Sequence, residues 1–339
     1  MANTYVYPTN AELTTIAQKF LPATELSSEI LSMFPSRSID ESMVIWEQMD
    51  NYQGLMKPRG YNGPPGRRKA VGMTRFAMLP GVYGDYSSID EEEITVERQY
   101  GTFNAPIDIS TLVMRKMVQV TDADIRRREQ LSWLLLTTGS YSVTDDKGAI
   151  LDTKGYTVRT FVAAVPWATL ATATPLADLR ALKLLHRGFS VDFGRKAKIL
   201  MNLNSVNNLL NNQNANDLGG KRRAGGSTFN SLADINQIFL DNDLPSVEAY
   251  DEGYLDDTGT FQPYIGNNVG VIKGLRTDGA PIGEWIMTRN ANNPGAQPGV
   301  YAKVIDNIDR QVPRTIEVHR GFNGGPAVKF PSAIPIISM

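Results

Sequence analysis

The strongest helical pattern of hydrophobic and polar positions spans residues 122–140. Its leucines recur at spacings of three and four residues, so several of them lie on one face of a helix. Thr121 is a suitable N-cap, Asp122 and Asp124 favour the first turn through the helix dipole, and Gly139 can end the helix. The pattern predicts one long, partly buried helix.

From residue 175 onward, helix and strand patterns alternate. A leucine stripe predicts a helix over 175–187 that ends at Gly188, and the apolar run AKILMNL (197–203) predicts a short buried strand. Between residues 141 and 162 the pattern predicts short strands separated by turns. Together these segments predict the α+β fold class.

The first 53 residues predict an arm with short helices. NAELTTIAQKF (10–20) has Asn10 as its expected N-cap, and SIDESMVIWEQM (38–49) has an apolar face at helical spacing. Farther along, residues 94–110 alternate with the period of a strand, which predicts an extended segment there.

Charge falls into two blocks between residues 57 and 97. Every charged residue from Lys57 to Arg75 is basic, and every charged residue from Asp85 to Glu97 is acidic. If the two blocks form the legs of one hairpin, each pair of opposite charges across the strands contributes about 0.2–1 kcal/mol. An isolated hairpin is marginal in water, so we expect this one to protrude and to lie on a neighbouring subunit. The expected intersubunit contacts are Arg59, Arg67, Arg68, Lys69, Arg75, Asp90, Glu91, Glu92 and Glu93.

Composition narrows the class of protein. The 339 residues are enough for two units with separate cores. The absence of cysteine excludes thiolate catalysis, disulfides and cysteine-ligated metal sites. A net charge of −2 argues against a dedicated nucleic-acid-binding protein. The longest uncharged run, residues 160–177, contains two prolines and four threonines, which is typical of strand and loop rather than of a membrane span. We therefore expect a soluble protein made in the cytoplasm.

No group of residues indicates catalysis. The two histidines, His186 and His319, are over a hundred residues apart and show no triad or metal-ligand spacing. The acidic stretch YDEGYLDDTG (250–259) lacks the spacing of an EF-hand and is typical of a solvated turn. The stretch GGKRRAGG (219–226) lacks the context of a phosphate-binding P-loop and is typical of a surface loop. We expect no catalytic residue, cofactor or metal.

Two clusters of basic residues could each be solvated surface or a contact site. One lies in the predicted long helix and the other in the glycine-rich loop; their members are Arg126, Arg127, Arg128, Lys221, Arg222 and Arg223. Such clusters are usually solvated surface, and the alternative is an electrostatic contact with DNA or with an assembly partner.

Four segments, in order, resemble the phage lambda major head protein family, whose members resemble the Hong Kong 97 capsid fold. They are RRREQLSWLLLTTGSYSV, PLADLRALKLLHRGFSVDFGRKAKILMNLNSVNNLLNN, VEAYDEGYLDDTGTFQPYIGNNVGVI and TIEVHRGFNGGPAVKFPSAIPIISM. The resemblance covers nearly the whole chain and depends on the combination rather than on any single motif.

The resemblance implies a layout for the chain. It consists of an N-terminal arm (1–53), an extended E-loop hairpin (54–98), a peripheral domain (99–174) with a spine helix at about 122–140, a mostly axial domain (175–310) and a C-terminal segment (311–339) that partly returns to the peripheral domain.

The resemblance also implies a function. It is that of a major capsid protein of a tailed double-stranded DNA bacteriophage, present in the virion and assembled in the host cytoplasm as hexamers and pentamers of an icosahedral shell. The implied partners are further copies of the chain, a portal, a scaffolding protein and packaged DNA bound without sequence specificity. Because the arm begins almost at once, we expect the scaffold to be a separate protein; a decoration protein is left open, and no membrane is expected. The alternative is a carboxylate-based α+β hydrolase that uses Asp251 and Glu252.

Overall fold

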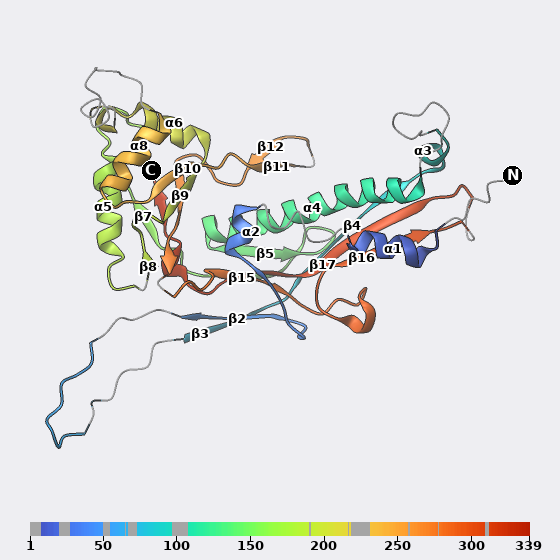
Figure 1. Cartoon of the computed structure of the whole chain (residues 1–339), viewed down its shortest axis with the longest axis horizontal. Coiled ribbons are helices and arrows are strands. Elements are labelled where there is room, and N and C mark those ends of the chain that lie inside the picture. Colours follow the sequence, from blue (N-terminus) through green and yellow to red (C-terminus); the bar gives the residue numbers. More distant parts are fainter. Residues whose placement is uncertain are drawn as a thin grey trace.

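The computed structural model describes residues 8–19, 28–49, 55–64, 66, 73–96, 108–189, 191–215, 217, 231–256, 258–276, 278–308 and 312–339. Figure 1 shows three parts: an elongated body around α4 and β17, a more compact unit around α5, α6 and α8, and a thin hairpin, the finger, that projects from below the body. The compact unit is called the axial unit after the layout that the resemblance implies. The finger consists of the described residues between 44 and 78.

A five-stranded sheet organises the body. Its order is β1-β15-β17-β16, and β4 also pairs with β17. Antiparallel pairing joins β17 to β4, β15 and β16, so this one long strand holds the sheet together. The strands are β1 (Ser36–Ser38), β4 (Gly81–Ile89), β15 (Gly283–Met287), β16 (Tyr301–Asp306) and β17 (Ile316–Val328).

The long helix α4 (Ile109–Thr138) lies along this sheet and is longer than the sequence pattern predicted. Its buried stripe already begins at Ile109 and Leu112, so packing on the sheet continues the helix through Thr121, which is buried inside it. The predicted N-cap at Thr121 is therefore wrong, and Asp108 occupies that position. The predicted end is confirmed: Gly139 adopts the left-handed conformation, and its N–H donates to the Leu135 carbonyl.

Two helices of the arm pack on the body. In α1 (Asn10–Lys19), Leu13 and Ala17 are buried against β16, β17 and α4. The N-cap is Thr9 and not Asn10, because Thr9 and Glu12 exchange hydrogen bonds between side chain and backbone. The second helix is α2 (Glu29–Met33), and β5 (Ser140–Thr144) and β6 (Ile150–Gly155) form a hairpin after α4.

The axial unit has its own sheet and core. The sheet order is β10-β9-β13-β18-β7, and the helices that pack around it include α5 (Pro175–Leu185), α6 (Leu203–Asn211) and α8 (Leu232–Asp241). The predicted helix near 175–187 and strand near 197–203 are confirmed. The strands are β7 (Thr160–Val162), β9 (Lys198–Met201), β10 (Ser246–Ala249), β13 (Val269–Lys273) and β18 (Ile336–Ser338).

Short elements complete the described chain. A hairpin of β11 and β12 reaches from the axial unit towards α4, and β8 pairs with β14. Their bounds, with those of two 3-10 turns, are β8 (Val191–Asp192), β11 (Gly253–Leu255), β12 (Phe261–Pro263), β14 (Leu275–Arg276), η2 (Pro294–Ala296) and η3 (Pro331–Ala333). Within the described ranges, no helix is long and apolar enough to cross a membrane.

The base of the finger is a two-stranded sheet. The strands β2 (Val44–Met49) and β3 (Met73–Met78) pair antiparallel, from Val44 opposite Met78 to Met49 opposite Met73. The helix predicted over 38–49 is therefore wrong. Val44 and Trp46 are buried while Glu47 is exposed, which follows the period of a strand once β3 is present as a partner.

The acidic block does not face the basic block. The strand β4 pairs with β17 of the body, and Glu91–Val96 form a helix, α3. The strand predicted over 94–110 is therefore wrong at residues 94–96 and again from Ile109, where α4 begins, and residues 97–107 lie outside the described residues. Three glutamates in the first turn of α3 favour a helix N-terminus and outweigh the strand preference of the β-branched residues after them. The predicted hairpin with opposite charges across its legs is thus incorrect.

Candidate assembly surfaces

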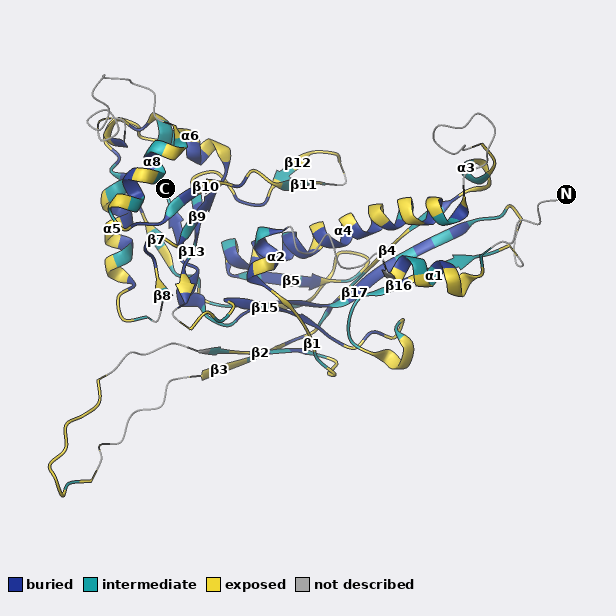
Figure 2. Ribbon diagram, viewed as in Figure 1, coloured by how far each residue is buried: buried dark blue, intermediate teal, exposed yellow. Residues whose placement is uncertain are grey.

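The tip of the finger (residues 55–64 and 66) has almost no cover from the rest of the described chain. Leu55, Met56 and Tyr61 are 96%, 93% and 105% exposed, and Figure 2 shows the finger as mainly exposed. Contiguous exposed apolar surface is typical of sites that contact another protein. Arg59 lies here, and its Nη1 donates to the Gly63 carbonyl at 3.5 Å.

The finger is anchored at its base. Val44 and Met78 are fully buried, and the rings of Trp46 and Phe76 stack with their centroids 5.2 Å apart. Where β3 ends, the Leu79 N–H donates to the Asp152 carboxylate at 3.1 Å, and this bond is the main cause of the lowered pKa of Asp152. The arrangement presents an uncovered tip on a packed base.

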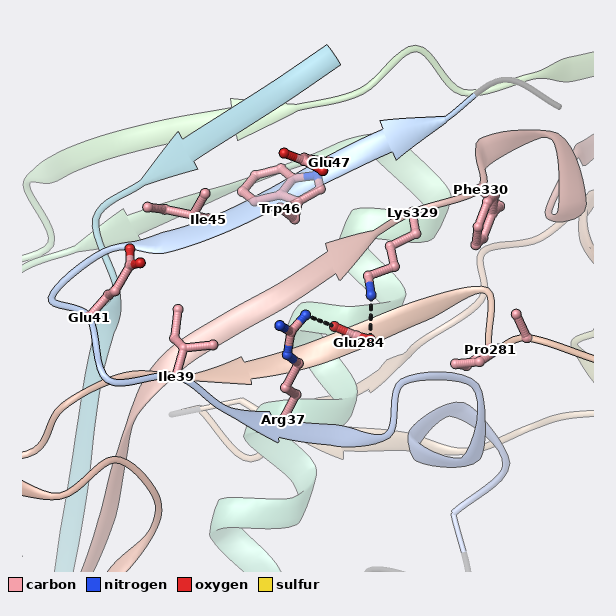
Figure 3. Close-up of a pocket in the computed structure, with 11 residues that line it drawn as sticks. Arg37, Ile39, Glu41, Ile45, Trp46, Glu47, Pro281, Glu284, Lys329 and Phe330 are labelled. Atoms are coloured by element: carbon pink, nitrogen blue, oxygen red, sulfur yellow. Dashed lines mark hydrogen bonds and ion pairs between the residues drawn. The ribbon is translucent and has the colours of Figure 1, made fainter. Parts of the chain in front are cut away.

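A pocket of about 460 Å³ lies between the finger base and the body sheet. Figure 3 shows Glu284 between two cations: it accepts from Arg37 at 3.2 Å and from Lys329. Trp46 and Phe330 provide apolar walls. The cations neutralise Glu284 inside the pocket.

The structure separates the residues that the sequence grouped as intersubunit contacts. Arg59 and Arg75 are on the finger, whereas Asp90 and Glu91–Glu93 are at the far end of the body, next to or within α3 (Figure 1). One of the acids has a partner in its own chain, since Glu93 pairs with Lys116 of α4 at 2.8 Å. Arg67, Arg68 and Lys69 lie outside the described residues.

The arginines of α4 do not form one basic face. Arg126 and Arg127 are exposed, and the Arg127 guanidinium lies 5.6 Å from the centre of the Tyr83 ring. Arg128 is 1% exposed and pairs with Asp124 one turn earlier at 3.0 Å, so the expectation that it faces DNA or a partner is wrong. The other cluster, Lys221, Arg222 and Arg223, lies outside the described residues.

Asp124 also binds a second cation, which no motif in the sequence indicates. Arg320 of β17 donates from Nε to Asp124 at 2.6 Å, and its side chain is fully buried. No sequence signal could join residues 196 positions apart; only the packing of α4 on β17 brings them together.

A groove of about 370 Å³ follows α4 where the hairpin of β11 and β12 approaches it. Beneath it, Glu129 is buried and accepts from the Ser28 hydroxyl and from the Tyr264 hydroxyl. Burial is the main cause that raises the pKa of Glu129. The groove is lined by Asp122, Ile125, Arg126, Glu129, Asp251, Glu252, Gly253 and Phe261.

The remaining polar candidates have local structural partners. Asp256 accepts from the backbone of Thr258 and Thr260, and these bonds close the turn between β11 and β12. The Nδ1 of His186 is 2.9 Å from the Leu182 carbonyl, and the Nε2 of His319 is 2.8 Å from Glu317. Among the described residues, no cluster of three or more side chains suited to a metal ion is present.

Comparison with known proteins identifies the family. A sequence model of the phage major capsid protein E family matches residues 12–312. The chain belongs to the phage major capsid protein E family. No curated protein sequence matches the chain.

Solved structures confirm the Hong Kong 97-like capsid fold of this major capsid protein. A prophage protein of E. coli CFT073 assigned as a capsid protein aligns with a TM-score of 0.61 at 14% identity, over 98% of this chain and 99% of that one. A phage-related protein of Bordetella bronchiseptica RB50 gives 0.55 at 10% identity, over 98% and 97%. The capsid of a native GTA particle gives 0.51 at 10% identity, over 94% and 91%.

These findings do not support the hydrolase alternative. Asp251 and Glu252 do line a groove, but the family and the structural neighbours are capsid proteins, which are structural.

Proposed function

We propose that copies of this chain assemble as hexamers and pentamers into the icosahedral head of a tailed phage, and that the finger makes contacts between neighbouring copies. The observation that carries the proposal is the finger itself. Its base is packed on the body, whereas the apolar and basic residues of its tip lie far from the rest of the described chain. Burying exposed apolar surface of this kind favours association. In a closed shell, every copy can bury its finger in an equivalent contact.

The proposal includes a set of partners beyond the copies themselves. They are a portal, a separate scaffolding protein and packaged double-stranded DNA, with the protein located in the virion after assembly in the host cytoplasm. The near-neutral net charge of −2 supports weak contact with DNA without sequence specificity, because strong binding needs an excess of cations facing phosphate.

Removing the part of the finger beyond β2 and β3 tests the proposal. Met49 and Met73 are directly paired at the outer end of β2 and β3, so replacing residues 50–72 by Asn-Gly closes the hairpin with a two-residue turn. We expect the variant to unfold thermally at the temperature of the parent protein but to form no particles in negative-stain microscopy.

The outcomes separate clearly. Shells, capsomers or tubes formed by the parent protein support the proposal, and a parent protein that stays strictly monomeric contradicts it. Normal particle yield from the shortened variant removes the finger from its proposed role.

A further inference from the structure

One buried arginine of the body has N–H groups without an acceptor. The Arg320 side chain of β17 is fully buried, and its Nε donates to Asp124 of α4 at 2.6 Å. Its Nη1 and Nη2 have no hydrogen-bond partner among the residues that the structure describes. A guanidinium group keeps its charge inside a protein, so burial without acceptors for these N–H groups is unfavourable. A further acceptor beside Arg320 would therefore stabilise the fold.

The neighbouring carboxylates do not supply that acceptor. The Oδ1 of Asp124 already accepts from Arg128 at 3.0 Å and its Oδ2 from the Nε of Arg320, so two guanidinium groups share one carboxylate. Asp85 lies directly opposite Arg320 in the pairing of β4 with β17. It accepts from the Tyr86 N–H at 2.8 Å and not from Nη1 or Nη2 of Arg320. A buried ion pair is favourable only when its remaining N–H groups are also satisfied.

Arg320 lines a small pocket together with a second arginine. The pocket, of about 200 Å³, lies between α4, β4 and β17, which run side by side in Figure 1. Arg127 of α4 also lines it; this side chain is exposed, and its guanidinium lies 5.6 Å from the centre of the Tyr83 ring. Guanidinium groups match the oxygen atoms of phosphate and carboxylate in both charge and geometry. Two of them around one small pocket favour an anion.

We propose that this pocket binds a small free oxyanion of the phosphate class between Arg127 and Arg320. The anion accepts from Nη1 and Nη2 of Arg320 and so connects α4 to β17. These nitrogens have almost no accessible surface in the described structure, so the exposed lining side chains shift slightly when the anion enters. Asp85 also lines the pocket, and its negative charge lowers the affinity for the anion. The inference goes beyond the proposed function, because it needs neither assembly nor DNA.

Titration of the purified full-length chain with inorganic phosphate tests the site. At constant ionic strength, calorimetry is expected to show saturable binding to the parent protein. Arg127→Gln should weaken this binding about tenfold, because it removes one charge-assisted contact, and Arg320→Met should abolish it. The matched control is Arg126→Gln, which removes the neighbouring exposed arginine of α4, a residue that lines the groove at β11 and β12 instead. The affinity of this control for phosphate should equal that of the parent.

A change at Asp85 provides an arm of opposite sign. Asp85→Asn removes the negative charge that opposes the anion, so the affinity for phosphate should rise about threefold or more. Asp85 and Arg127 are both exposed, so their variants are expected to fold and decide the question even where Arg320→Met is unstable. Thermal unfolding without phosphate checks the fold of each variant.

Several results would overturn the site. The first is no saturable binding of phosphate by the parent, or unchanged binding by a folded Arg320→Met variant. Equal weakening by Arg126→Gln and Arg127→Gln would attribute the binding to the general positive charge of α4. Weaker binding by Asp85→Asn would contradict the expected sign.

A final arm separates a free anion from the phosphates of DNA. A short DNA duplex is added at the same ionic strength and is expected to leave the bound phosphate in place. Displacement of phosphate by the duplex would overturn the assignment to a free anion. Because binding is measured on the unassembled chain, failure to form particles would contradict the proposed function and leave this inference standing.

Discussion

At the scale of single residues, the body is joined by a buried carboxylate between two cations. Asp124 of α4 accepts from Arg128 at 3.0 Å and from Arg320 of β17 at 2.6 Å, and both guanidinium groups are almost completely buried. The sequence showed only an acid followed by three arginines, which reads equally well as a solvated helix face. The partner that changes this interpretation comes from a strand that is distant in sequence.

Replacing Asp124 is expected to destabilise the isolated subunit strongly. Asp124→Asn leaves two buried cations without their anion, and breaking a buried pair in this way costs about 3–5 kcal/mol. The matched control is Asp122→Asn, the same change at an exposed position of the same helix, which should alter the unfolding free energy by no more than about 0.5 kcal/mol. Urea unfolding measures both. Equal effects of the two substitutions would contradict the role of Asp124.

A second buried carboxyl connects three distant segments. Glu129 of α4 accepts from Ser28, which caps α2, and from Tyr264, which follows β12. Burial raises its pKa above the ordinary value of 4.5, the nearby Glu252 adds to the rise, and Arg126 opposes it. The protonated form is therefore favoured more in the folded protein than in the unfolded chain.

The raised pKa of Glu129 determines how the unfolding free energy changes with pH. The favourable contribution of Glu129 is complete below about pH 4.5 and is lost as the pH rises through the raised pKa. Glu129→Gln removes the titration, so the unfolding free energy of the variant relative to the parent should increase as the pH rises above 4.5. Unfolding curves measured across this pH range test the sign. A difference that is constant with pH would exclude Glu129 as the titrating group.

At the scale of elements, the sequence predicts best where one element determines its own pattern. The end of α4 at Gly139 and the helix α5 follow from local residues, and both are confirmed. The start of α4 and the nature of residues 44–49 depend on partners elsewhere in the chain, namely the body sheet and β3. In a segment as short as residues 44–49, apolar residues at helical spacing and apolar residues at strand spacing are hard to distinguish. The pattern alone therefore could not decide between a helix and a strand there.

The helix end at Gly139 gives a prediction of its own. A Cβ at this position meets Val158 at 2.5 Å and the Tyr156 carbonyl at 2.8 Å, in a left-handed conformation with φ of 79°. Gly139→Ala should therefore lower the unfolding free energy by about 2–4 kcal/mol, combining backbone strain with overpacking. Gly148→Ala is the matched control, because Gly148 has φ of 80° and open space around it. Its cost should be only about 1–2 kcal/mol. A similar loss in both variants would show that the contact with Val158 is unimportant.

At the scale of the whole molecule, the fold class and the existence of a protruding hairpin were predictable from sequence, whereas the two strands that form its legs and the location of the charges were not. Lys57, Arg59 and Arg75 of the basic block are on the finger, but Asp90, Glu91, Glu92 and Glu93 of the acidic block lie at the far end of the body, because β4 joins β17 rather than β3. Strand pairing between distant segments decides this, and charge patterning along one chain cannot reveal it. The domain boundaries taken from the resemblance stay predictions, as do the contacts assigned to individual residues.

The position of β18 has a consequence for biosynthesis. This strand, Ile336–Ser338, lies between β13 and β7 within the axial sheet, and Ile337 is fully buried there. A growing polypeptide still attached to the ribosome lacks the strand that joins β7 to β13 until these residues have emerged. The axial unit must therefore complete its sheet after residue 338 has been translated. Prematurely terminated chains would have an incomplete axial unit and could not form a normal capsid subunit.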